Sequence, residues 1–175
     1  MGYIHTMKTD EIIKHLEENR LVFQSLLLGK EEEEYSFRPD KESWSILEIL
    51  CHLLDEERED FKTRIKNTLT TPLKQPPAID PVGWVTSRNY AKQVYGERLE
   101  AFLTERRQSI KWLKSLDDPK WNNTYMHPTA GKMTAYSLLA NWLAHDYHHI
   151  RQINRRMYEY LLQKSKVNLV YAGNW

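Results

Sequence analysis

The chain has 175 residues, of which 41% are hydrophobic, enough for a single domain, residues 1–175, with a sizeable core. Lysine and arginine total 25 and aspartate and glutamate total 24, so the formal net charge of +1 provides no basic field for gripping nucleic acid. A single cysteine, Cys51, excludes an intramolecular disulfide and favours a reducing compartment, so we expect a cytoplasmic protein. We expect neither a signal peptide nor a membrane span, because no apolar run is long enough.

Apolar residues recur at helical spacing in the first half of the chain. The first predicted helix begins at Thr9 and stops at Gly29. The second begins after Ser45, which forms a capping box with Glu48, and runs to about Leu69. Residues 71–86 contain four prolines and one glycine, and this composition predicts a long loop without regular helix.

The second half of the chain contains two more helical patterns. Ser87 or Asn89 is expected to cap the third helix, and Thr134 the fourth. The polar residues 117–132 between them are interrupted by prolines and a glycine, and strand patterns are nearly absent outside the tail at 166–175. The predicted fold is therefore all-α, a four-helix bundle with long connections between helices 2 and 3 and between helices 3 and 4.

The fourth helical segment contains LAHDYHHIRQI, residues 143–153, with three histidines. Successive residues of a helix diverge by about 100°, so His145 and His149 lie within about 40° of each other and can share a metal ion. His145 with His148 is a poorer but possible pair. A catalytic zinc-like site takes three protein ligands and an open position. His52 is the best third candidate, because it follows an apolar run in the second helix, where an unpaired imidazole would be costly.

Acidic residues follow His52 directly. Asp55 and Glu56 lie within a turn of it and are candidates to orient an imidazole or to take a proton from bound water. The rest of the DEERED segment is expected to be a solvated face. We expect His5, His15 and His127 to be surface or loop residues. Five aromatic residues of loops and helix ends are candidates for the wall of a pocket, with packing against the bundle favoured over substrate contact for each: Trp44, Trp84, Tyr125, Trp142 and Tyr147.

Two segments resemble the DinB/YfiT-like superfamily of four-helix-bundle proteins. WSILEILCHLLDEE, residues 44–57, is similar to the family's signature of W-S, an apolar run and a histidine, and HDYHHIRQI is similar to its H-x-x-x-H-x-x-Q-I signature. The resemblance covers roughly residues 8–165 and implies a divalent ion, zinc or nickel, held by His52, His145 and His149 with water completing the site. Family members are described as metal-dependent hydrolases, some relatives transfer low-molecular-weight thiols or isomerise thiol conjugates, and homodimers are common.

These observations lead to one main functional hypothesis and two rivals. A metal-dependent enzyme would use the ion to activate water, as a hydrolase, or a small-molecule thiol, as an S-transferase, with Glu56 or Asp55 moving the proton. The alternative is a non-catalytic, stress-related binding or dimerisation module with a structural metal or none. A nucleic-acid role is the weakest, because RRQSIK and RQINRR are expected to be solvated faces. The expected partners are a small-molecule substrate and a second copy of the chain, with neither nucleic acid nor membrane.

Overall fold

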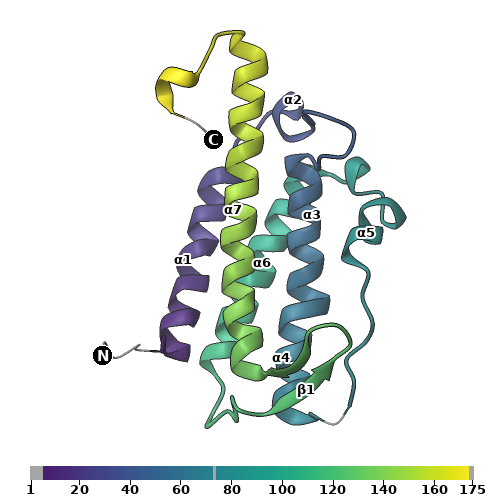
Figure 1. The fold of residues 1–175 in the computed structure, drawn as a ribbon, viewed down its shortest axis with the longest axis vertical. Helices are drawn as coiled ribbons and strands as arrows, with labels where there is room; N and C mark the ends of the chain where they lie inside the picture. Colours follow the sequence, from purple (N-terminus) through teal and green to yellow (C-terminus); the bar gives the residue numbers. More distant parts are fainter. Residues whose placement is uncertain (1–5, 73, 174–175) are drawn as a thin grey trace.

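Four long helical segments pack side by side in the computed structural model, which describes residues 6–72 and 74–173 (Figure 1). The predicted all-α four-helix bundle is confirmed. No helix within the described ranges is long and apolar enough to cross a membrane. The segments are α1 (Thr9–Leu27), then α3 (Ile46–Glu56) continued by the π-helical turn η1 (Glu57–Phe61) and α4 (Lys62–Thr70), then α6 (Tyr95–Lys114), and finally α7 (Ala135–Ser165).

The directions of the four segments explain the long second connection. α6 begins where α1 ends, since the hydroxyl of Tyr95 donates to the carbonyl of Leu27 at 2.7 Å, and it finishes beside the first half of α1, where Lys114 pairs with Glu17 at 2.6 Å. The segment α3–α4 runs in the same direction as α6, so the chain must return along the bundle between them (Figure 1). α7 then runs the opposite way and projects beyond the bundle at its C-terminal end (Figure 1).

The connection between α4 and α6 is more ordered than its prolines predict. It contains α5 (Pro81–Ser87) and the 3₁₀ turn η2 (Tyr90–Lys92), so the prediction of no regular helix at 71–86 is wrong. Pro81 occupies the first turn of α5, where its missing N–H is not needed, and the Asp80 carboxylate accepts from the N–H of Gly83 at 3.0 Å. The cap predicted at Ser87 or Asn89 is also wrong, because α6 begins only at Tyr95.

Short elements complete the other connections. A short helix α2 (Glu32–Tyr35) follows α1, and a hairpin of β1 (Thr124–His127) and β2 (Gly131–Thr134) precedes α7. The hairpin is not predicted from the sequence, because strands of four residues are too short for a clear alternation of apolar and polar residues. The described part of the tail forms a 3₁₀ turn, η3 (Val170–Ala172), instead of a strand.

The two predicted helix starts with capping side chains are confirmed. Ser45 Oγ accepts from the N–H of Glu48 at 3.3 Å, and the Glu48 carboxylate accepts from the N–H of Ser45 at 2.8 Å. At the start of α7, Thr134 and Ser137 exchange the equivalent pair of hydrogen bonds at 2.9 Å. Both caps fix the start, and therefore the angular register, of a helix that carries a candidate site residue.

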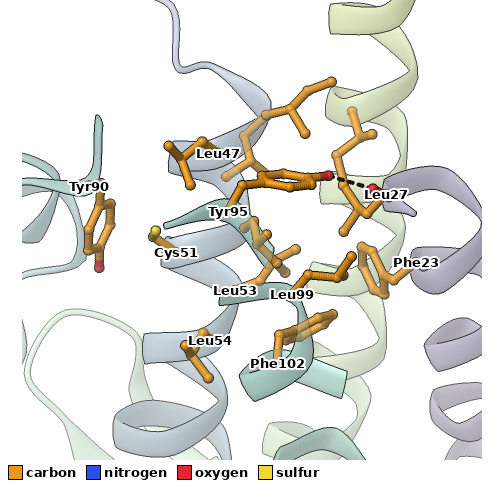
Figure 2. Packing of buried hydrophobic residues seen from close by; sticks show 14 of the residues in the cluster. Phe23, Leu27, Leu47, Cys51, Leu53, Leu54, Tyr90, Tyr95, Leu99 and Phe102 are labelled. Carbon is orange, nitrogen blue, oxygen red and sulfur yellow. Dashed lines mark hydrogen bonds between the residues drawn. The ribbon is translucent and has the colours of Figure 1, made fainter. Parts of the chain in front are cut away.

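Apolar side chains fill two clusters stacked along the bundle. The upper cluster surrounds the hydrogen bond from Tyr95 to Leu27 (Figure 2), and in it Phe23 meets Phe102 edge to face, with ring centroids 5.3 Å apart. Burial of each large apolar side chain stabilises the fold by about 1.5–3 kcal/mol. The lower cluster contains Ile12, Ile13, Leu16, Phe61, Ile65, Ile110, Leu113, Tyr125, Leu138, Leu139, Trp142 and Leu143.

A buried group of polar side chains separates the two clusters, and we call it the central polar layer: Asn19, Glu57, Arg106, Trp142 and Asp146. The Arg106 guanidinium donates to both Asp146 oxygens at 2.7 and 2.8 Å and to Glu57 at 2.9 and 3.0 Å. Asn19 and the Trp142 indole donate to Asp146 and Glu57, each at 3.2 Å. The prediction that DEERED and RRQSIK are solvated faces is therefore wrong at Glu57 and Arg106, which are both 1% exposed.

Candidate metal centre

Three histidines from two helices meet at one point, and we call them the histidine site: His52, His145 and His149. His52 lies on α3, and the other two lie one turn apart on α7. One ring nitrogen from each lies within 4.8 Å of the others. The Nε2 atom of His145 is 3.3 Å from that of His52 and 3.0 Å from that of His149. The predicted convergence is therefore present.

Two of the three separations between these nitrogens fit a bound metal ion. Zinc–nitrogen bonds of about 2.0–2.1 Å in a tetrahedral arrangement place two ligand nitrogens about 3.3 Å apart. The two Nε2 separations of 3.3 and 3.0 Å are close to that value. Three imidazoles supply the three protein ligands of a catalytic zinc-like site and leave a fourth position open. The three imidazole nitrogens therefore suit a divalent ion that is intermediate between hard and soft, such as zinc.

The histidine site keeps its imidazoles neutral, as metal binding requires. Burial lowers the pKa of His52 to about 3, with the nearby His149 and His148 adding to the shift. Burial and the neighbouring histidines lower the pKa of His145 to about 2, and burial lowers that of His149 to about 4. Neutral rings at pH 7 present a lone pair to an ion without first losing a proton.

Neighbouring side chains hold the three rings in place. His149 Nδ1 lies 2.7 Å from Gln152 Oε1, which accepts a hydrogen bond from Nδ1–H and so leaves Nε2 available as a ligand. The rings of Phe61 and His145 are 5.0 Å apart, and those of Trp44 and His52 are 5.1 Å apart. His52 Nδ1 is buried without a hydrogen-bond partner among the described residues.

The histidine site opens onto a cavity of about 500 Å³. Trp44 lines this cavity as well as packing on His52. The exposed His148 also lines it but does not belong to the histidine site. The full lining is Glu42, Ser43, Trp44, His52, His145, His148, His149, Gln152 and Arg156.

Neither carboxylate predicted to move a proton lines this cavity. Asp55 accepts hydrogen bonds at 2.7 Å from both Arg88 and Tyr90 and borders a separate small cavity. Glu56, one turn after His52 on α3, is 5% exposed. Burial raises its pKa to about 8, with a further contribution from Asp60. Glu56 therefore holds its proton near neutral pH.

His15 and His127 lie apart from the histidine site, as expected. His15 is half-buried on α1, with its Nδ1 atom 2.9 Å from the Glu18 carboxylate. His127 lies in the hairpin and accepts from the N–H groups of Thr129 and Ala130 at 3.2 and 3.1 Å. His5 lies outside the described residues.

The helix that carries His52 changes its winding directly after the site. The π-helical turn η1 begins five residues after His52 and contains Glu57 and Phe61. Phe61 packs on His145, while Glu57 joins the central polar layer. π-helical turns inside α-helices occur frequently at functional sites. Hydrophobic periodicity alone does not predict this turn.

The fold and the histidine site define a four-helix-bundle protein with a candidate metal centre between its second and fourth long helices. The sequence profile of the DinB superfamily matches residues 15–153, most of the chain, and the chain belongs to this superfamily. The structure is similar to that of YfiT from Bacillus subtilis, with a TM-score of 0.77 and 18% identity over 96% of this chain and 94% of that one. That protein is described as a probable metal-dependent hydrolase with an unusual four-helix bundle topology. None of the curated proteins matches the sequence.

Proposed function

We propose that this protein is a metal-dependent hydrolase whose divalent ion, zinc or nickel, is held by His52, His145 and His149. The observation that carries the proposal is the convergence of three neutral imidazoles beside an accessible cavity. A divalent ion at this point would lower the pKa of a bound water and so supply a nucleophile at neutral pH. The description of YfiT and the membership of the superfamily support the same reaction class.

The chain's own residues would divide the remaining work between them. Gln152 fixes the ring of His149 by accepting a hydrogen bond from its Nδ1–H, and Trp44 forms an apolar wall beside His52. We propose Glu56 as the group that exchanges a proton with the site, because it lies one turn from His52 and its pKa is about 8. Asp55, the other candidate, would act only through a rearrangement of its hydrogen bonds with Arg88 and Tyr90.

Turnover of small molecules with and without metal tests the proposal. Untagged protein, stripped with a chelator and then reloaded with zinc or nickel, is assayed against esters, amides and thiol conjugates. We expect hydrolysis by the reloaded protein, none by the stripped protein, and none by His149→Ala. His15→Ala, which changes a histidine remote from the site, serves as the matched control and keeps the activity.

The same assay separates the rival functions. Turnover that requires an added low-molecular-weight thiol would assign the site to thiol transfer instead of hydrolysis. Hydrolysis that persists in the stripped protein or in His149→Ala would contradict the proposal. A blank across all substrate classes, with one ion bound per chain, would favour the non-catalytic binding or dimerisation module. The expected homodimer stays a prediction, which light scattering on the same protein would check.

A further inference from the structure

A buried arginine lines the cavity of the histidine site but is not one of the proposed metal ligands. Arg156 lies on α7 and lines this cavity, yet it is only 7% exposed. The sequence pattern RQINRR predicts a solvated face, and that prediction is wrong at this arginine. A buried guanidinium is costly unless its N–H groups and its charge are matched by partners.

The hydrogen bonds of Arg156 are incomplete. Its Nε and Nη1 atoms are buried and make no hydrogen bond with any described residue. Nη1 lies 2.7 Å from Glu159 Oε2, close enough for an ion pair but outside hydrogen-bonding geometry. Glu159 also accepts a hydrogen bond from Arg155 Nε at 2.9 Å. One carboxylate is thus shared by two guanidinium groups, and the three side chains together carry 2 − 1 = +1.

Other acidic groups near Arg156 do not complete its bonding. Asp40 lies close enough for Arg156 to contribute to lowering its pKa, but its oxygens accept from Ser43 and from the N–H of Glu42. Among the described residues, Glu42 is the only acidic one that lines the cavity, and it is exposed. Arg156 therefore lines this cavity, and a second cavity shared with Arg151 and Glu159, with donors that no described residue satisfies.

The position of Arg156 relates its charge to the histidine site. It follows His149 by seven residues on the same helix, which places it on nearly the same face and about 10 Å further along the axis. Long side chains on a helix lean towards its N-terminus, and this direction brings the guanidinium back towards His149. A small molecule in the cavity can therefore contact both the guanidinium and the histidine site.

We infer that Arg156 binds a carboxylate group of the substrate and holds it within about 10 Å of the histidine site. A planar guanidinium matches the two oxygens of a carboxylate better than any other side chain does. The inference names the substrate class of the proposed hydrolase, and it rests on that proposed function because only an enzyme has a substrate. The anion site itself rests only on the contacts of Arg156.

Calorimetric titration of the metal-free protein tests this inference directly. The probes are succinate, its uncharged analogue succinamide, and inorganic phosphate. We expect succinate to bind and succinamide not to bind, with Arg156→Gln weakening succinate binding by about tenfold or more. Arg156→Lys keeps the charge but loses the planar guanidinium, so it should bind succinate more weakly than wild type and more tightly than Arg156→Gln. Lys164→Gln removes an exposed charge from the far end of the same helix, where it lines neither cavity, and should stay within about twofold of wild type.

Circular dichroism and zinc content distinguish a failure of the inferred anion site from a failure of the proposed metal centre. Arg156→Gln should keep its helical signal and its zinc, whereas His149→Ala should lose zinc but still bind succinate in the metal-free titration. Equal binding of succinate by wild type and Arg156→Gln, or no discrimination between succinate and succinamide, would overturn the inference. Binding of phosphate in place of succinate would overturn its assignment to a carboxylate.

Discussion

Two groups of buried polar side chains lie close together in this bundle, and they differ in how completely they are bonded. The central polar layer joins all four long helical segments, and none of its buried polar side-chain atoms lacks a hydrogen-bond partner. The histidine site and the adjoining Arg156 leave His52 Nδ1 and Arg156 Nε without partners among the described residues. Asp146 and His145, adjacent on α7, point into these two different environments.

This difference separates what holds the fold from what is available to a ligand. A fully satisfied buried network specifies one arrangement of the helices, whereas partly satisfied groups beside a cavity mark a place where another molecule completes the bonding. We therefore expect changes in the central polar layer to lower stability, and changes in the histidine site to lower affinity for metal or ligand.

The largest effect is expected from Arg106→Met. This change removes the only cation of the central polar layer and leaves Glu57 and Asp146 buried without a counter-charge, which should cost about 3–5 kcal/mol in the free energy of unfolding. Urea denaturation followed by circular dichroism measures the loss. The exposed neighbour gives the control, since Arg107→Met should change stability by less than about 0.5 kcal/mol. Equal stability of the two variants would show that the layer does not hold the fold.

Gln152→Ala should act on metal affinity with little effect on stability. Loss of the acceptor at His149 Nδ1 leaves the ring free to rotate or to change tautomer, and outer partners of this kind are worth about 10–100-fold in metal affinity. Competition with a chromogenic zinc chelator measures the change. Asn154→Ala, which removes only a bond to the carbonyl of Ile150, is the matched control. An unchanged affinity in Gln152→Ala would remove Gln152 from the site.

Glu56→Gln should sharpen the comparison through its pH dependence. The folded state raises the pKa of Glu56 from its ordinary 4.5 to about 8, so the folded protein binds the proton more tightly. Stability from this group is complete below pH 4.5 and falls as pH rises towards 8, by up to about 1.4 kcal/mol per pH unit. Glu56→Gln cannot lose a proton, and its stability relative to wild type should increase across this window.

The control for this experiment has the opposite sign. Hydrogen bonds from Arg88 lower the pKa of the exposed Glu59, so its contribution is present above pH 4.5 and is lost in acid. Glu59→Gln should therefore be slightly less stable than wild type throughout pH 5–8, without a change of slope. Parallel stability curves for wild type and Glu56→Gln would show that Glu56 is ionised in the folded protein.

The smallest effect is expected from Asn19→Leu, a change of similar volume. It removes one donor to Asp146, whose two oxygens keep their bonds to Arg106, so the cost should be about 1 kcal/mol. Thermal unfolding measures the shift. A cost as large as that of Arg106→Met would mean that the layer fails as a unit whenever any member is removed.

The helices and the convergence of the three histidines could be predicted from sequence because both follow from periodicity. The cap at Ser45 and the spacing of His145 and His149 fix which way the side chains point on each helix. Packing of the two helices in a bundle then brings His52 close to the other two histidines. Metal binding itself, and the roles of Asp55 and Glu56, stay predictions. The helical periodicity could predict where the three histidines lie, and it carries no information on what they bind.

The central polar layer and Arg156 could not be predicted, because charged residues at helical spacing resemble a solvated face. Burial of Glu57 and Arg106 depends on pairing between residues 49 positions apart, and no local pattern encodes that pairing. A rule that treats every proline as a helix breaker does not predict the short helix α5, because Pro81 occupies the first turn, where proline is favoured. Both errors come from interactions or positions that a local rule ignores.

Metal content per chain tests the central claim most directly. Protein without an affinity tag, loaded with zinc and then dialysed, is analysed by elemental mass spectrometry for wild type, His149→Ala, His148→Ala and the triple alanine variant of His52, His145 and His149. We predict one ion per chain in wild type and in His148→Ala, and none in the other two, with the helical signal preserved. One ion per chain in the triple variant, or none in wild type, would contradict the proposed centre.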